Sequence, residues 1–170
     1  MCIRDRSNAF ELSKYGFDIK IIDHDEGQNS SNAALGILMG KIYQKRKGRG
    51  WLLRQKSSKL WPKWINILQR YNPKLIFEKP LFKITSDLEK FKKLTRFVDN
   101  YPNDGLEIVE ASSYTLSHIN KTFKGNRLQG IISHQDGRID PRILLETLDK
   151  TLETKNIKTC LLYTSPSPRD

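Results

Sequence analysis

The stretch Leu12–Asp25, LSKYGFDIKIIDHD, decides the fold that the sequence predicts. Ser7–Tyr15 has the pattern of a helix end, and Gly16 suits the left-handed residue that follows a helix C-terminus. The apolar run Phe17–Asp23 predicts a strand buried on both faces, as in a parallel sheet. A helix, a glycine, a strand and then an acidic residue is the order found in the later part of a βαβ unit.

Three further helices are predicted downstream. They cover about residues 57–70, 86–98 and 141–155. Ser57 or Ser58 can cap the first, whose Pro62 then lies near its first turn. Asp140 can cap the last, with Pro141 at the first helical position, where a missing N–H costs nothing.

The strands downstream predict a second, antiparallel sheet. It should lie within residues 77–133, with a break at Pro80 in FEKPLFKIT and a turn at Asp136-Gly137 that closes LQGIISHQDGRID. The segment NAALGILMG is either a helix start or a buried loop, and residues 41–50 are expected to form an exposed basic loop. A short helix or loop is expected through His118.

Length and composition indicate a soluble globular protein. The chain has 170 residues, of which 37% are hydrophobic and 9% aromatic, and its mean hydropathy is −0.60. No run of about eighteen apolar residues predicts a membrane span, and the N-terminus lacks the pattern of a signal peptide. We therefore expect a cytoplasmic protein that does not contact a membrane.

The two ends look foreign to the rest of the chain. Residues 1–6 (MCIRDR) and 160–170 (CLLYTSPSPRD) resemble translated sequencing-adapter DNA, so we expect both ends to be non-native. The alternative for the second end is a natural tail containing Pro166 and Pro168. Both cysteines, Cys2 and Cys160, lie in these ends. The interior therefore offers no disulfide, thiolate nucleophile or cysteine metal site.

The net charge of +11 is concentrated in one segment. Residues 27–77 contain no Asp or Glu but many Lys and Arg, with Trp51, Trp61, Trp64 and Tyr71 among them. Such a segment can track a phosphate backbone and stack on bases, or it can be a solvated lysine-rich surface over core aromatics. The helical spacing of the aromatic residues favours the second interpretation.

Asp23 and the loop after it are the candidates for ligand binding. An acidic side chain at a strand end can accept hydrogen bonds from both hydroxyls of a ribose, although an ordinary loop residue looks the same. In NSSNAALGILMG, Ser30 and Ser31 offer hydroxyls and N–H groups, and small residues up to Gly36 allow a flat or phosphorylated ligand to approach. The alternative is the N-terminus of a helix packed on the sheet.

The sequence favours neither a metal site nor a covalent hydrolase. His24, His118 and His134 are far apart and lack metal-ligand spacing, so ordinary loop histidines are expected. There is no G-x-S-x-G motif and no interior cysteine.

Taken in order, LSKYGFDIKIID, the hydroxyl-rich loop, SSNAALGIL, the LWPKW helix and DGRIDPRILLETL resemble one known family over residues 7–159. It is the D-amino-acid oxidase family of FAD-dependent oxidoreductases, particularly its glycine-oxidase-like members. The resemblance implies an α/β fold with a partial Rossmann-like FAD-binding domain, a βαβ unit without its first strand. An incomplete antiparallel α+β substrate domain is inserted into it. The expected limits are 7–50 for the FAD-binding part, 51–135 for the substrate part and 136–159 for the returning helix.

The resemblance also implies roles for particular residues. Asp23 would hold the adenosine ribose with His24 beside it, Ser30 and Ser31 would lie near the pyrophosphate, and Leu35, Gly36 and Ile37 would pass the ribityl chain and flavin ring. The segment Asp136, Gly137, Asp140 and Pro141 would return the chain to the cofactor domain, in a structural role. No catalytic residue can be nominated.

The implied function is the oxidation of an amino acid or amine by hydride transfer to flavin, with FAD as cofactor and a small molecule as partner. The family's glycine-rich loop should precede Ser7, and its C-terminal half should follow Thr159. We therefore expect a middle part of a longer protein that binds FAD poorly by itself and is inactive. The alternative is a nucleic-acid-binding module that uses residues 27–77. The oligomeric state is left open.

Overall fold

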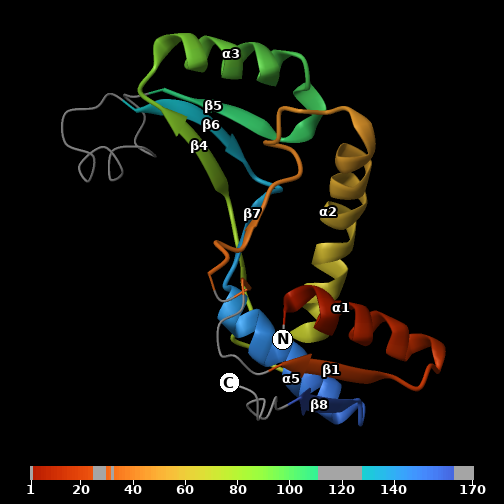
Figure 1. Cartoon of the computed structure of the whole chain (residues 1–170). Helices are drawn as coiled ribbons and strands as arrows, with labels where there is room; N and C mark the ends of the chain where they lie inside the picture. Colours follow the sequence, from red (N-terminus) through yellow and green to blue (C-terminus); the bar gives the residue numbers. More distant parts are fainter. Residues whose placement is uncertain (1, 25–29, 32, 111–127, 163–170) are drawn as a thin grey trace, which may run out of the picture. The chain divides into compact units, whose positions relative to one another are not determined.

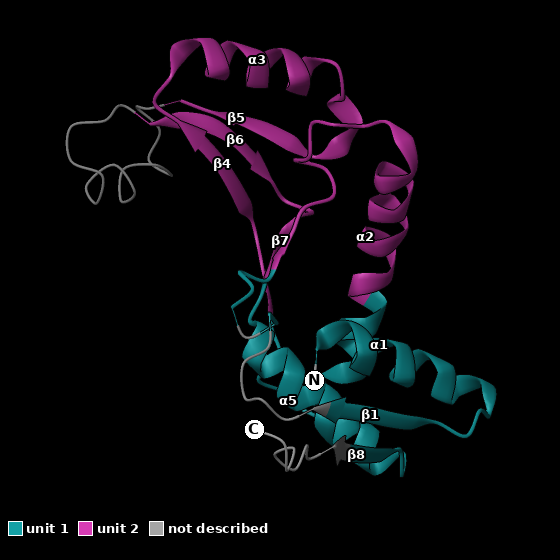
Figure 2. Ribbon diagram, in the orientation of Figure 1, with its two compact units in different colours: residues 1–36, 63–76, 139–170 teal, residues 37–62, 77–138 magenta. Residues whose placement is uncertain are grey.

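The computed structural model describes residues 2–24, 30–31, 33–110 and 128–162, and of His24, Leu161 and Leu162 only the main chain. The chain divides into two compact units, coloured separately in Figure 2. Unit 1 comprises residues 1–36, 63–76 and 139–170, and unit 2 comprises residues 37–62 and 77–138. The segment around His118 lies outside the described residues, and the domain limits given above stay a prediction.

Unit 1 contains two helices, a short 3-10 helix and a pair of parallel strands. The elements are α1 Ile3–Leu12, η1 Ser13–Tyr15, β1 Lys20–His24, α5 Pro141–Thr154 and β8 Lys158–Leu162 (Figure 1). Strands β1 and β8 pair in parallel, with Lys20 opposite Lys158 and Asp23 opposite Leu161. Gly16 follows the helical segment with a φ of 75°, as the sequence predicts.

The strand β1 is buried on one face only. Ile21 is 7% exposed, whereas its neighbour Ile22, on the other face of the strand, is 58% exposed. The expectation that this run is buried on both faces is therefore wrong for the described residues. Within the described residues this sheet has only two strands, and α1 is a helix that contacts β1.

The core of unit 1 lies where α1 packs against α5. Phe10 and Leu148 are buried, and the ring of Phe10 meets Trp64 edge to face at 5.4 Å. The side chain of Asp140 accepts the N–H of Arg142 at 2.8 Å, which confirms the predicted cap of α5.

The first turn of α1 takes part in this core. The largely buried side chain of Arg6 forms an ion pair with Asp149 of α5, with Nη2 2.9 Å from Oδ2. Arg6 belongs to the segment that we expect to be non-native, so the folded chain uses that segment whatever its origin. The origin itself stays a prediction.

Unit 2 contains two small sheets and a helix that covers one of them. Its elements are β2 Ile37–Leu38, the larger part of α2 Gly48–Leu68, β3 Phe77–Glu78, β4 Leu81–Thr85, α3 Leu88–Asp99, η2 Pro102–Asp104, β5 Leu106–Val109, β6 Gln129–Ser133 and most of β7 Gly137–Ile139. One sheet has the antiparallel order β4-β6-β5, as predicted, and the other has the order β2-β7-β3. The predicted break at Pro80 separates β3 from β4.

The sheet β4-β6-β5 follows the two-residue periodicity of a strand with apolar residues on both faces. Ile131 of β6 packs with Leu94 and Phe97 of α3, which lies over this sheet in Figure 1. The next residue, Ile132, packs with Val109 in a separate cluster. The alternation places consecutive isoleucines in two different cores.

Helix α2 begins nine residues before the start that the sequence predicts. It starts at Gly48, so Ser57 and Ser58 lie inside it and Pro62 is an interior residue. The expected cap and first-turn position are therefore wrong. The preceding turns have no buried apolar stripe, since Leu52 and Leu53 are exposed, and they contain the poor helix formers Gly48 and Gly50. Neither periodicity nor propensity therefore indicated that the helix begins at Gly48.

Replacing Leu148 by Ala should strongly destabilise unit 1. The side chain is 0% exposed, and its loss leaves a cavity between α5 and its neighbours, which typically costs roughly 2–5 kcal/mol. Leu60→Ala, at a side chain that is 51% exposed, is the matched control and should cost roughly 0.5 kcal/mol or less. Urea denaturation followed by circular dichroism measures both, and equal effects would contradict the assigned core.

Candidate functional site

The carboxyl end of β1 carries the first candidate residue, Asp23. This side chain is half-buried, and the residue lies opposite Leu161 in the parallel pair. Ligands of α/β proteins bind outside the carboxyl ends of parallel strands. The fold therefore puts the Asp23 carboxylate at the edge of the sheet where a ligand is expected. His24 follows in the same strand, and its side chain lies outside the described part.

The N-terminus of α1 is capped by Ser31 rather than by its own N-cap residue. The Ser31 hydroxyl accepts the N–H of Ile3 at 2.9 Å, and its side chain is largely buried. The thiol of Cys2 instead donates to the side chain of Asp5. A helix N-terminus carries a partial positive charge and favours anions. Ser31 thus lies at the helix end best suited to a phosphate, while Ser30 beside it is exposed.

Gly36 makes a close contact that any other residue would lose. Its φ is 68°, its carbonyl accepts the N–H of Ile139 at 3.0 Å, and a Cβ atom would lie 1.8 Å from the carbonyl oxygen of Ile139. Residues 34–36 are irregular and Ile37 begins a strand, so neither a helix start nor a buried loop is right. Leu35 and Ile37, which flank the glycine, are 72% and 40% exposed. The segment therefore presents apolar side chains at its surface.

Asp136 organises the chain after β2. This side chain is 3% exposed, and its carboxylate accepts three consecutive main-chain N–H groups, those of Gly40 at 2.7 Å, Lys41 at 3.0 Å and Ile42 at 2.6 Å. Its own N–H donates to the hydroxyl of Ser133 at 3.2 Å. A buried carboxylate is stable only when it is hydrogen-bonded in this way.

The loop after β2 is anchored at Lys41, Ile42 and Arg46, where the expectation of an exposed loop is wrong, and from Gly48 on the chain is helical. Residues 44, 45 and 47 are exposed, as expected. Ile42 is 2% exposed, and both Lys41 and Arg46 form ion pairs with Asp104, the lysine at 2.5 Å. The Arg46 guanidinium also lies 3.8 Å from the centre of the Tyr101 ring. The anchoring residues come from η2 and its surroundings, about sixty positions along the chain.

Opposing effects act on the Asp104 carboxyl. Burial by itself raises its pKa, but the hydrogen bonds from Lys41 and Arg46, helped by their charges, hold the pKa below the ordinary value of an aspartate. The ion pairs are thus strongest in the ionised form that predominates at neutral pH.

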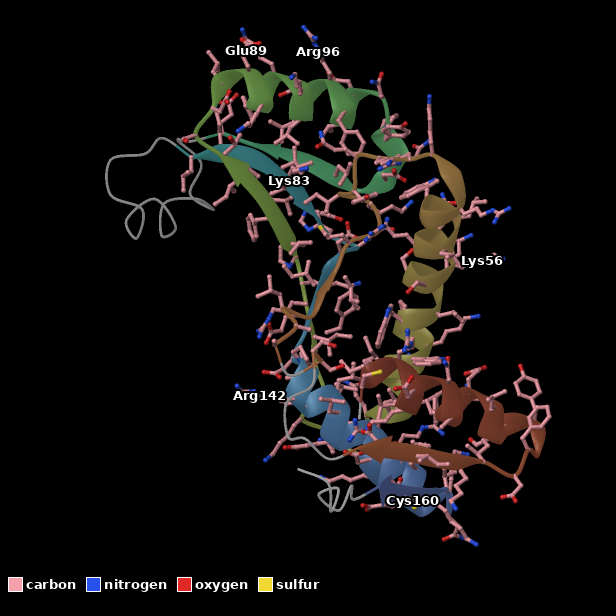
Figure 3. All side chains as sticks on the ribbon, in the orientation of Figure 1. Lys56, Lys83, Glu89, Arg96, Arg142 and Cys160 are labelled. Atoms are coloured by element: carbon pink, nitrogen blue, oxygen red, sulfur yellow. The ribbon has the colours of Figure 1, made fainter. Side chains whose placement is uncertain are left out.

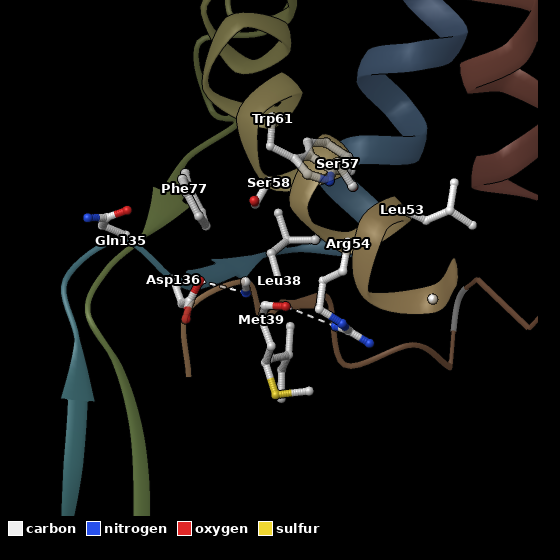
Figure 4. A pocket seen from close by; sticks show the side chains of 13 residues that line it. Leu38, Met39, Leu53, Arg54, Ser57, Ser58, Trp61, Phe77, Gln135 and Asp136 are labelled. Atoms are coloured by element: carbon white, nitrogen blue, oxygen red, sulfur yellow. Dashed lines mark hydrogen bonds between the residues drawn. The ribbon is translucent and has the colours of Figure 1, made fainter. Parts of the chain in front are cut away.

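A cavity of ≈ 330 Å³ lies within unit 2, between β2, α2 and the β6–β7 corner (Figure 4). Its size suits a small molecule. Among the described lining residues Arg54 is the one cation, and its Nη1 donates to the carbonyl of Met39 at 2.9 Å. The lining is mixed, with Leu38 and Trp61 beside Ser58, Gln135 and Asp136. Sequence reasoning missed this cavity, because its walls come from separate elements.

Two searches of the described residues are negative. Among them, no group of three or more His, Cys, Asp or Glu side chains is placed to hold a metal ion. In the same part of the chain, no helix has the length and apolarity that crossing a membrane requires.

Comparison with known proteins identifies the family. The model of the DAO family, described as FAD dependent oxidoreductase, matches residues 7–161. The chain belongs to this family of FAD-dependent oxidoreductases. This confirms the predicted family, the mixed α/β fold class and the FAD dependence that comes with the family. Among curated protein sequences, none matches significantly.

Solved structures with the same fold include three oxidases that are named for different substrates. Iminodiacetate oxidase from Chelativorans sp. BNC1 aligns with a TM-score of 0.77 and 16% identity over 95% of this chain and 45% of that one. Glycine oxidase from Geobacillus kaustophilus aligns with a TM-score of 0.73 and 20% identity, over 95% of this chain and 44% of that one. L-alpha-glycerophosphate oxidase from Mycoplasma pneumoniae, with FAD bound, aligns with a TM-score of 0.65 and 16% identity, over 94% of this chain and 42% of that one. The chain thus spans less than half the length of each.

Asp136→Asn should destabilise unit 2 by roughly 1.5–3 kcal/mol. The amide keeps the shape of the side chain but loses the charge, and its NH₂ group cannot accept an N–H. Asp99→Asn, at an exposed position of α3, is the matched control and should change stability by roughly 0.5 kcal/mol or less. Thermal or urea denaturation tests this, and a neutral Asp136→Asn would contradict the role of the carboxylate.

The Asp104 ion pairs should make stability depend on pH in a defined direction. The pKa of Asp104 in the folded protein lies below its value of about 3.9 in the unfolded chain. The stabilisation of the fold by the ionised carboxylate is therefore complete above that value and is lost as the pH falls through the folded pKa. Asp104→Asn should be less stable than the unaltered chain at pH 7, and the difference should shrink under acid. Denaturation midpoints measured from pH 7 downward test this, and a constant difference would refute it.

Proposed function

We propose that the protein is an FAD-dependent enzyme that oxidises an amino acid or an amine at the carbon bearing the nitrogen. The family match over residues 7–161 carries this proposal. Iminodiacetate oxidase and glycine oxidase, which are named for amino-acid substrates, support the substrate class. Because the glycerophosphate oxidase has the same fold, the fold alone does not choose the substrate. The activity of the whole protein is part of the proposal, since the chain spans less than half of these structures.

Three features of unit 1 fit the cofactor. A carboxylate, that of Asp23, stands at the end of a parallel strand, where it can accept hydrogen bonds from ribose hydroxyls. Ser31 lies at the N-terminus of the ten-residue helix α1, the kind of helix end that favours an anion, although its first turn here carries Asp5 and belongs to the segment expected to be non-native. Gly36 has no side chain, and its main chain therefore passes close to that of Ile139.

On this proposal each predicted residue has a distinct task. Asp23 binds the adenosine ribose and His24 lies beside it, while Ser30 and Ser31 lie near the pyrophosphate. Because the Ser31 hydroxyl already accepts a hydrogen bond from Ile3, its contribution is to hold the end of α1. Leu35, Gly36 and Ile37 pass the ribityl chain and the flavin ring.

The reaction requires little acid–base chemistry from the chain. When bound, FAD supplies the hydride acceptor for the carbon–hydrogen bond next to nitrogen. A substrate that binds as the neutral amine needs no general base, and the imine product is hydrolysed by water. The exposed apolar side chains of Leu35 and Ile37 would cover the reacting region and exclude water from it.

A nucleic-acid-binding role for residues 27–77 has weaker support. Two of its cations, Lys41 and Arg46, are paired with Asp104. Trp51, Trp61 and Trp64 are each partly buried, so they offer less than a full ring to a base. This alternative stays a prediction, which the salt dependence of any nucleic-acid binding would test.

Asp23→Asn should weaken the binding of FAD to the protein encoded by the complete gene. Loss of charge-assisted hydrogen bonds to the ribose typically costs about 1.5–3 kcal/mol, which corresponds to roughly 10–150-fold in Kd. Asp18→Asn, at an exposed residue near the start of the same run, is the matched control and should leave Kd unchanged. Quenching of flavin fluorescence measures both.

The unaltered protein from the complete gene should purify yellow, with a flavin absorbance band, and amines or amino acids should bleach the band without air. A colourless protein that FAD does not bind would overturn the proposal. A yellow protein that only other substrates reduce would overturn the substrate class alone.

A further inference from the structure

A second cavity of unit 2 is lined almost wholly by basic and aromatic residues. It measures ≈ 500 Å³ and lies where the loop after β2 meets the start of α2. We call it the basic cavity, and its lining residues are Tyr43, Lys45, Lys47, Gly48, Arg49, Gly50, Trp51 and Arg54. The proposed flavin chemistry makes no use of it.

Three cations of the basic cavity form no ion pair with any acidic residue that the structure describes. In the same loop, Lys41 and Arg46 pair with Asp104. By contrast, Lys45, Lys47 and Arg49 have no acidic partner among the described residues, and each is exposed. None of the described residues that line the cavity is acidic. The uncompensated positive charge is therefore a local property of this site and not only of the sequence.

The start of α2 adds to the positive potential. The helix begins at Gly48, and its first turn contains no acidic residue. Because a helix N-terminus carries a partial positive charge, Lys47 and Arg49 lie where cations are unfavourable. A Cβ atom placed on Gly50 would meet no atom within 4 Å, so the space beside this turn is open. A bound anion would relieve the repulsion between these groups.

The shape of the site favours a small ligand over a nucleic acid. Its volume lies in the range of small-molecule sites. Stacking of successive bases needs open aromatic faces, but the Tyr43 ring is covered by the Arg54 guanidinium at 4.0 Å. The Trp51 ring has Arg46 at 5.2 Å. Arginine side chains suit phosphate and carboxylate groups, which they can bind with two parallel hydrogen bonds.

We propose that the basic cavity binds a small oxyanion with two or more negative charges, a phosphorylated or polycarboxylate compound. Lys45, Lys47 and Arg49 supply the charge, and the start of α2 supplies main-chain N–H groups. All the residues involved belong to unit 2 and differ from those proposed for FAD. The inference can therefore be tested independently of the proposed oxidoreductase activity.

A triple variant, Lys45→Gln, Lys47→Gln and Arg49→Gln, tests the proposal in the full chain. The control variant, Lys56→Gln, Lys59→Gln and Lys93→Gln, removes the same charge from exposed positions that do not line the cavity. Lys56 projects outward from α2 in Figure 3. Titration calorimetry with pyrophosphate and with citrate, at constant ionic strength, distinguishes phosphate from carboxylate ligands.

The unaltered chain should bind at least one of the two anions saturably. The triple variant should lose tenfold or more in affinity, and the control less than twofold. Without anion, the triple variant should also melt higher, by roughly 2–4 °C, because unfavourable cations have left the helix N-terminus. Failure of both anions to saturate, or equal losses in the two variants, would overturn the proposal. Tighter binding of single-stranded DNA, lost in the triple variant, would also overturn it.

Discussion

The carboxylate of Asp136 is the contact on which the described structure of unit 2 depends most. It is almost completely buried and accepts the N–H groups of three consecutive residues, Gly40, Lys41 and Ile42. A buried charge without these partners would be costly, and the three N–H groups would in turn lose their acceptor. The strands β6 and β7 and the loop after β2 are thus held together by one side chain. Its neighbour Gly137 packs so closely on Glu78 that a Cβ atom would lie 2.2 Å from its carbonyl oxygen.

This anchor explains how a loop rich in lysine and arginine can be ordered. Ile42 enters the core next to Leu94 and Ile131, while Lys41 and Arg46 turn toward Asp104. The cations that follow are left for solvent or for a ligand. The basic residues of this loop thus fall into two groups. Lys41 and Arg46 stabilise the fold through Asp104, and the others line the basic cavity.

The family assignment gives the same chain a second set of constraints. In unit 1, Gly36 crosses the segment before α5 so closely that a side chain has no room, and the residues on either side expose apolar groups. The proposed function places this segment beside the flavin. The chain spans less than half of each of the solved structures that share its fold.

Local patterns predicted the elements whose causes are local. Gly16 after a helix and the Asp140 cap followed by Pro141 were both recognisable because their causes lie within a few residues. The start of α2 was missed, since its first turns bury no apolar stripe.

The bonds from Asp136 to residues 40–42 and the ion pairs of Asp104 were also missed. These contacts join residues about sixty to one hundred positions apart, and a single sequence carries no periodic sign of them. The same reason hid the cavities. Asp23 and Ser31 were recognisable as candidates from the order of the elements, but the capping of α1 by Ser31 was not.

The most direct test of this account is amide hydrogen exchange of Gly40, Lys41 and Ile42 in the full chain, resolved by NMR. Three N–H groups bound to one buried carboxylate should exchange far more slowly than those of an exposed loop, and together, as a single cooperative unit. Exchange as fast as in an unstructured peptide at all three positions would contradict it.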